Sequence, residues 1–211
     1  MKKHVVTLTT FIFVITAGIL HAQNKLPEGW EARFDSPSNS LSDIHFADND
    51  GAIHLESGPA HAIFYRDSDE LSGNYKVSAT FVMDKNASAH GEAYGLFIGG
   101  KNLQKDSQQY LYFLTRRDGK YLIKTRDGGS TKTIVGWTKS NDIEAEEGSA
   151  SQTNSLGISV GNDNVSFWAN GKKITSIAKS KLPETNGIAG IRANHHLTLD
   201  IKDLDMTKGN Q

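Results

Sequence analysis

Tyrosine side chains and one arginine recur at alternate positions of a short stretch in the middle of the chain. Tyr110, Tyr112 and Arg116 have the same parity, so in a β-strand their side chains point to one face of the sheet. Tyr94 can join them if its strand is adjacent, and Glu92 would supply a hydrogen-bonding carboxylate. Aromatic rings offer a flat apolar face to a sugar ring, while flanking polar groups take its hydroxyls. These five side chains are therefore our candidate carbohydrate-binding site, and a position in the core or at its rim is the alternative for the tyrosines.

Acidic side chains suggest a second chemistry. Retaining glycoside cleavage requires two carboxyl groups about 5 Å apart, one of which is kept protonated by its surroundings. Most carboxylates of this chain cluster in expected loops, whereas Glu56 and Glu92 fall on or beside expected strands. These two are the candidate catalytic pair if the protein is a glycoside hydrolase. A solvated position on a strand is the alternative for each.

Metal-binding patterns are incomplete. His195 and His196 are adjacent, and adjacent side chains on a strand point in opposite directions, which makes joint ligation of a metal awkward. The segment Asp48-Asn49-Asp50-Gly51 matches part of a calcium loop but lacks the further oxygen ligands and the distal glutamate. We therefore expect a plain Asx turn there and no cofactor, with a structural calcium ion as the alternative.

The chain around these candidates reads as short strands. Two alternating runs, Gln109 to Arg116 and Tyr121 to Arg126, flank Arg117-Asp118-Gly119, and an Asp-Gly pair between such runs is a strong hairpin signal. Residues 74–83 place five apolar side chains on one parity, which predicts a half-buried strand. Asn170-Gly171 signals another hairpin. About a dozen such strands, with no helical stripe, predict an all-β sandwich or barrel.

The beginning of the chain has the pattern of a secretory signal peptide. Lys2 and Lys3 provide a basic start, a short apolar run follows, and Ala22 precedes the expected cleavage point. A membrane anchor is the alternative, but the apolar run is short for a span, and no other segment could cross a bilayer. We expect residues 1–22 to be the signal peptide, residues 23–211 to form one domain, and the protein to be periplasmic or extracellular.

Composition excludes several classes of function. The 211 residues include no cysteine, so there is no disulfide framework, no thiolate metal site and no thiol nucleophile. The 23 lysines and arginines are nearly balanced by 24 aspartates and glutamates. Because both signs are interspersed, the charge distribution argues against a nucleic-acid partner.

Several stretches together carry a family resemblance. They are Gly73–Val77, Tyr94–Phe97, Tyr110–Phe113, Val165–Lys173, Gly187–Ile191 and Leu199–Leu204. With them, the region from Trp30 to Met206 resembles the concanavalin A-like jelly-roll superfamily, which includes laminin-G-like and legume-lectin-like modules. The resemblance implies a β-sandwich of two antiparallel sheets. Within the superfamily the chain looks nearest to bacterial 3-keto-disaccharide hydrolase-like domains, which implies a glycoside-cleaving activity.

The chain departs from these hydrolase-like domains where their active-site groups would lie. They carry an Asn-Ser-Gly-(Ile/Val)-x-x-Arg strand and a Gly-x-Glu-x-Gln strand. The corresponding strands here are Glu92–Gly100, without arginine, and Gln108–Phe113, without glutamate. The Glu-x-Asp-x-x-Glu motif of laminarinase-type glucanases is absent too. We therefore expect a non-catalytic glycan-binding or attachment module. The alternatives are a glycoside hydrolase and a protein-interaction module, which would show a broad apolar exposed face.

Overall fold

The computed structural model describes residues 25–84, 91–146 and 151–209. The expected signal peptide, residues 1–22, lies outside the described residues. Within these three ranges no helix is both long enough and apolar enough to cross a membrane.

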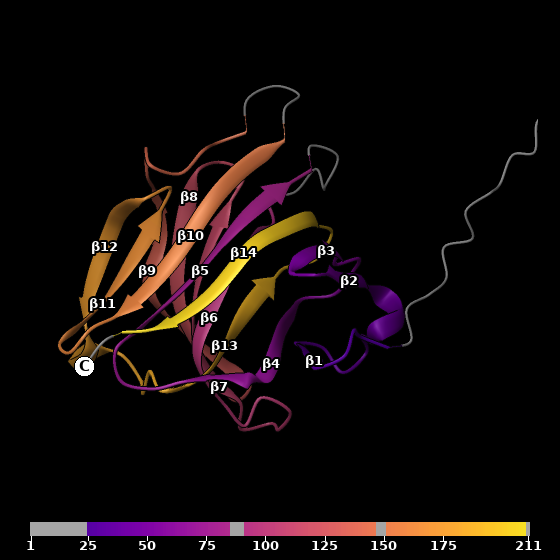
Figure 1. Ribbon diagram of the computed structural model, residues 1–211, viewed down its shortest axis with the longest axis horizontal. Coiled ribbons are helices and arrows are strands. Elements are labelled where there is room, and N and C mark those ends of the chain that lie inside the picture. The colour runs from indigo at the N-terminus through magenta and orange to yellow at the C-terminus, as the bar shows by residue number, and fades with distance from the viewer. Residues whose placement is uncertain (1–24, 85–90, 147–150, 210–211) are drawn as a thin grey trace, which may run out of the picture.

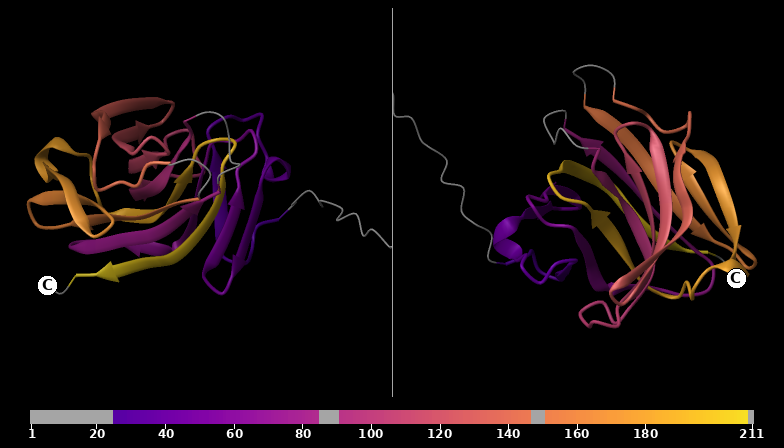
Figure 2. Two further views of the ribbon diagram at one scale, coloured as in Figure 1. Left: turned by 90° about the horizontal axis from the view of Figure 1, so that it is seen from above. Right: turned by 180° about the vertical axis from the view of Figure 1, so that it is seen from behind.

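The described residues fold into two antiparallel sheets of seven strands each, stacked as the layers of a sandwich (Figures 1 and 2). Sheet A has the order β1 (Trp30–Phe34), β4 (Ala62–Leu71), β13 (Gly187–Ala193), β6 (Ala93–Lys101), β7 (Gln109–Arg116), β8 (Lys120–Asp127) and β9 (Ser130–Lys139). Sheet B has the order β12 (Lys172–Ala178), β11 (Asn164–Ala169), β10 (Gln152–Val160), β5 (Tyr75–Met83), β14 (Thr198–Lys208), β3 (Ala52–Glu56) and β2 (His45–Asn49). Two 3-10 turns, Leu41–Asp43 and Lys179–Lys181, lie in connections. This is the jelly-roll sandwich that the sequence predicted.

The hairpins expected from turn residues form where the sequence places them. Arg116 pairs with Lys120 across the turn between β7 and β8, and Gly119 has a φ of 70°. Asn170 and Gly171 join β11 to β12 with φ angles of 48° and 78°. Positive φ at both central residues is what a two-residue type I′ turn requires, and Asn-Gly meets it at low cost.

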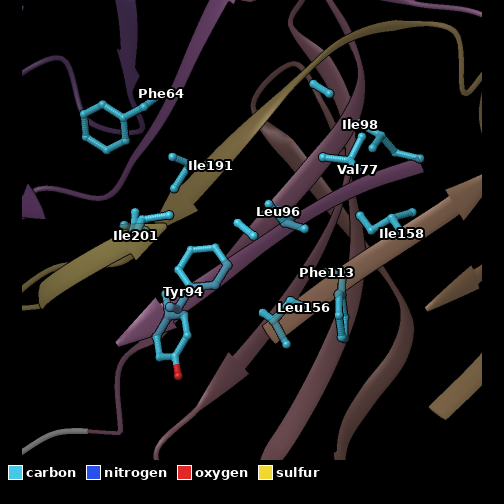
Figure 3. Close-up of a cluster of buried hydrophobic side chains, with 14 of the residues drawn as sticks. Phe64, Val77, Tyr94, Leu96, Ile98, Phe113, Leu156, Ile158, Ile191 and Ile201 are labelled. Atoms are coloured by element: carbon cyan, nitrogen blue, oxygen red, sulfur yellow. The ribbon is translucent and has the colours of Figure 1, made fainter. Parts of the chain in front are cut away.

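Alternate side chains of the strands point between the two sheets and fill the space there. In β5 the buried side chains alternate as Tyr75, Val77, Ala79, Phe81 and Met83. From sheet A, Phe113 lies with its ring centre 5.4 Å from that of Phe167 on β11. Figure 3 shows Phe113 beside Leu156 in this cluster. The strand predicted for residues 74–83 is therefore confirmed.

Sheet A also buries apolar side chains on its outer face, which we define as the face turned away from sheet B. A second cluster there comprises Ile63, Tyr65, Ala93, Phe97, Leu103, Tyr110, Tyr112, Leu114 and Leu122. Consequently β6 is buried at every position from Ala93 to Gly100. The outer face of sheet A therefore has an apolar layer against which polar side chains can pack.

Candidate ligand-binding site

The outer face of sheet A carries two of the predicted tyrosines. Tyr110 and Tyr112 are both members of the outer cluster, and their ring centres are 5.6 Å apart. Arg116 follows on the same strand with the same parity. Their common position comes from strand periodicity alone, since alternate residues of one strand share a face.

Tyr94 does not belong to this face. Strand β6 is adjacent to β7, but Tyr94 lies opposite Thr115, whereas Phe97 lies opposite Tyr112. Directly opposed residues share a face, so Tyr94 points between the sheets (Figure 3). Its ring centre lies 5.1 Å from that of Phe81. The expectation that Tyr94 joins the other tyrosines is wrong, because the register gives it the opposite parity.

Removing the hydroxyl of Tyr94 should therefore affect stability. That hydroxyl donates to Oε1 of Gln152 at 3.3 Å and accepts from Nδ2 of Asn154 at 3.4 Å. Tyr94→Phe leaves two buried amide groups short of a partner, and we expect the free energy of unfolding to fall by about 1 kcal/mol. Urea denaturation measures this loss. The matched control is Tyr112→Phe, because the Tyr112 hydroxyl makes no hydrogen bond to a described residue. Equal stabilities of the two variants would contradict the assignment.

Glu92 and Glu56, the candidate catalytic carboxylates, belong to different sheets. Glu92 precedes β6 of sheet A, and its Oε1 lies 3.5 Å from Nε2 of His195. Glu56 ends β3 of sheet B, and its Oε1 lies 3.4 Å from Nε2 of His54. Each carboxylate thus has its own histidine partner. Lying on different sheets, they do not form the close pair that retaining glycosidases use.

The segment resembling part of a calcium loop forms the expected Asx turn between β2 and β3. Oδ1 of Asp48 accepts the backbone N–H of Gly51 at 2.8 Å, and Oδ2 accepts the indole N–H of Trp30 at 2.8 Å. Asp50 and Gly51 have φ angles of 54° and 86°. In the part of the chain that the structure describes, no group of three or more histidine, aspartate or glutamate side chains could hold a metal ion.

A buried ion pair lies beside the tyrosines. Arg192 of β13 is only 5% exposed and donates to both oxygens of Asp35, at 3.2 Å and 2.6 Å. The same guanidinium donates to the hydroxyl of Tyr110 at 3.1 Å and lies 5.1 Å from the ring centre of Tyr112. It therefore fixes both rings from one side. An arginine inside an otherwise apolar strand is the only sequence signal for this pair.

Asp35 is kept ionised by two cations. Burial is the largest single influence and would raise the pKa of its carboxyl group, but the charge and hydrogen bonds of Arg192, together with the charges of Arg126 and His61, outweigh it. Arg126 adds to them with a nitrogen 3.7 Å from Oδ1 of Asp35. The pKa of Asp35 is consequently lowered, and the pair stays charged at neutral pH.

An exposed tryptophan lies toward the end of the face where β7 turns into β8. Trp137 of β9 is the one large apolar side chain among the described residues that is exposed, at 38%. The guanidinium carbon of Arg116 lies 4.4 Å from its ring centre, a cation–π contact. Arg116 itself donates to both oxygens of Asp118, each at 2.8 Å, and Lys120 lies 3.1 Å from that carboxylate. The indole is therefore supported by a cation that cannot turn freely.

A hollow of about 530 Å³ opens near the other end of the face, beside Asp35 and Arg126. Gln108 lines it and is only 2% exposed, and its Oε1 has no hydrogen-bond partner in the described ranges. Nε of Arg33, which also lines the hollow, is buried and equally unpaired. Buried polar groups are normally satisfied, so two side chains that line this hollow each keep an unpaired polar atom beneath its surface.

No protein-family model matches the chain, and no curated protein sequence is significantly similar to it. Solved structures are similar in fold. The carbohydrate-binding module CBM66 from Bacillus subtilis superposes with a TM-score of 0.61 at 10% identity, covering 85% of this chain and 96% of that one. The exoplasmic/lumenal domain of VIP36, solved with Ca²⁺ and Man3GlcNAc, gives 0.57 at 10% identity, covering 87% and 85%. A Bacillus subtilis protein of unknown function with a galectin-like fold gives 0.57 at 12% identity, covering 85% and 89%. These likenesses show that the chain has a concanavalin A-like jelly-roll fold.

Proposed function

We propose that this protein is a non-catalytic glycan-binding module whose ligand lies on the outer face of sheet A. The observation that carries the proposal is the exposed indole of Trp137, held over the guanidinium of Arg116. A flat apolar ring with fixed polar groups beside it is the arrangement that stacks on a sugar and takes its hydroxyls. Asp118 and Lys120 are the nearest fixed polar groups.

The middle of the face offers further groups for hydrogen bonding. Lys124 lies directly opposite Tyr112 in the register of β7 and β8. Neither the ammonium group of Lys124 nor the hydroxyl of Tyr112 bonds to a residue in the described ranges. Lys124, which is half-buried, can therefore bind a ligand without breaking a hydrogen bond, whereas Tyr112 is only 4% exposed and lies beneath it. The Tyr110 hydroxyl accepts a hydrogen bond from Arg192, so Tyr110 supports the site and is not itself free to bind the ligand.

Two of the structural neighbours are themselves described by carbohydrate binding or a bound carbohydrate. CBM66 is a carbohydrate-binding module, and the VIP36 domain was solved with Ca²⁺ and Man3GlcNAc. At 10% identity they support the proposal only through the shared fold. We further propose that the protein is exported by residues 1–22, acts in the periplasm or outside the cell, and consists of one domain over residues 23–211.

The two other functions lack a supporting observation. Hydrolysis by Glu56 and Glu92 requires a carboxyl pair, and each of them pairs with a separate histidine. A protein-interaction module requires a broad apolar surface. Within the described ranges Trp137 is the single large apolar side chain classed as exposed.

A glycan array followed by titration calorimetry tests the proposal. Trp137→Ala should weaken binding at least about tenfold, because removing an aromatic anchor typically costs about 2 kcal/mol. Thr138→Ala is the neighbouring control, and Trp168→Ala removes a tryptophan from sheet B. Loss of binding in Trp168→Ala with full binding in Trp137→Ala would contradict the proposed face. Absence of binding to any glycan would contradict the function.

A further inference from the structure

The central strands of sheet A carry an excess of positive charge on the outer face, although the whole chain has a formal net charge of −1. Five basic side chains of its central strands lie on this face: Arg116 on β7, Lys120, Lys124 and Arg126 on β8, and Arg192 on β13. Two carboxylates accompany them, and each is shared by two cations. Asp118 contacts Arg116 and Lys120, and Asp35 contacts Arg192 and Arg126. The excess is three positive charges.

Two of these cations, Lys124 and Arg126, have N–H groups that no described residue accepts. Lys124 is half-buried and forms no ion pair or hydrogen bond with a described residue. Arg126 donates from Nε to the backbone oxygen of Gly128 at 2.7 Å, and its other polar contact within the described ranges is the 3.7 Å one with Asp35. Its remaining N–H groups can therefore bind a ligand. Successive same-face positions of a strand are roughly 7 Å apart, so these two cations can hold separate groups of one chain molecule.

The hollow beside Arg126 supplies what an anionic sugar requires. Arg126 and Arg33 both line it, and a guanidinium binds carboxylate or sulfate oxygens through parallel hydrogen bonds. Gln108 also lines the hollow, and its buried Oε1 has no hydrogen-bond partner in the described ranges. Asp35 does not cancel this positive charge, because Arg192 already pairs with it through two hydrogen bonds. Asp106 also lines the hollow and contacts Arg33 at 3.4 Å, so Arg126 is the cation of the hollow that is left to bind an anion.

We propose that the ligand of this face is an acidic glycan. One carboxylate or sulfate group lies in the hollow against Arg126, and a second lies at Lys124 beside Tyr112. The inference rests on the proposed glycan-binding function and adds the charge of the ligand. Attraction between the basic face and such a polymer weakens as ionic strength rises, since salt screens exposed charges.

The test compares acidic polymers with their neutral counterparts. The probes are polygalacturonate and alginate as uronates, dextran sulfate as a sulfate ester, carboxyl-reduced polygalacturonate, and dextran. We expect the full chain to bind at least one acidic probe about tenfold more tightly than its neutral counterpart, and to release it at high salt. The uronate and sulfate arms distinguish the two sources of negative charge.

Matched variants locate the effect. Lys124→Gln and Arg126→Gln should each weaken binding of the acidic probe about fivefold or more, as expected for loss of one charge-assisted contact. The control is Lys132→Gln. Lys132 lies on β9 opposite Thr125, which has the other parity, and it is exposed. Urea denaturation verifies that each variant is folded.

Each result decides the inference. Equal affinity for acidic and neutral probes, or an equal loss in Lys132→Gln and Lys124→Gln, overturns the acidic ligand. Binding to neutral glycans alone overturns it as well, while the proposed function stands. Failure to bind any probe, together with a blank glycan array, overturns the proposed function itself.

Discussion

Replacing Arg192 by methionine is expected to lower the free energy of unfolding by about 3 kcal/mol, as breaking a buried ion pair does when one partner is left behind. The methionine fills a similar volume but removes both hydrogen bonds to Asp35 and the one to the Tyr110 hydroxyl. Arg126 at 3.7 Å is then the remaining cation. The carboxylate of Asp35 is only partly exposed, so water compensates for a fraction of the loss.

Arg126→Met is the matched control for this change. Its contact with Asp35 is longer and lacks the two parallel hydrogen bonds of Arg192, so we expect a loss of no more than about 1 kcal/mol. Urea denaturation of both variants, and of Arg192→Met combined with Asp35→Asn, measures the coupling. The double variant should lose less than the sum of the single losses. A loss in Arg192→Met no larger than in Arg126→Met would refute the role given to the pair.

The same pair predicts how stability depends on pH. Because the pKa of Asp35 is lower in the folded protein than in the unfolded chain, the folded state gains stability from this group above about pH 4. That contribution is lost as the pH falls through the folded pKa. In Arg192→Met the principal cause of the lowering is removed, so the acid-side loss from this group should shrink. Denaturation midpoints between neutral and acid pH measure the difference.

Gly95→Ala is expected to cost at least about 3 kcal/mol, at the upper end of what overpacking a core does. A Cβ atom at Gly95 would lie 2.1 Å from the backbone oxygen of Phe113 and 3.1 Å from Cα of Leu114. A backbone oxygen held in a sheet cannot rotate away as the end of a side chain can. Strands β6 and β7 would have to separate, and β7 carries Tyr110 and Tyr112. The proposed binding face would therefore be disturbed together with the fold.

Gly136→Ala provides the control for the glycine prediction. Gly136 lies on edge strand β9, and a Cβ atom there meets nothing within 4 Å. We expect a change within about 0.5 kcal/mol, which is usual for surface substitutions. Yield of soluble protein and urea denaturation compare the two variants. If Gly95→Ala were as stable as Gly136→Ala, the close approach of β6 and β7 would not be a real constraint.

Features that depend on neighbouring residues could be predicted from the amino-acid sequence. Alternation over Tyr75 to Met83 predicted a strand with one buried face, and Asp118-Gly119 and Asn170-Gly171 predicted hairpins. The common face of Tyr110 and Tyr112 followed from their spacing within one strand. These predictions succeed because side-chain direction along a strand and the φ angles of a tight turn are properties of the local chain.

Which side chains of different strands lie on the same face of a sheet depends on how the strands pair. Tyr94 lies opposite Thr115, and because the side-chain period is two, a shift of one residue moves a side chain to the other face. Asp35 and Arg192 meet across 157 positions of sequence, a distance over which no spacing rule operates. Trp137 is exposed because β9 forms the edge of sheet A. Register, long-range pairing and edge position arise only when the strands assemble into sheets. For that reason the sequence predicted the candidate site only in part.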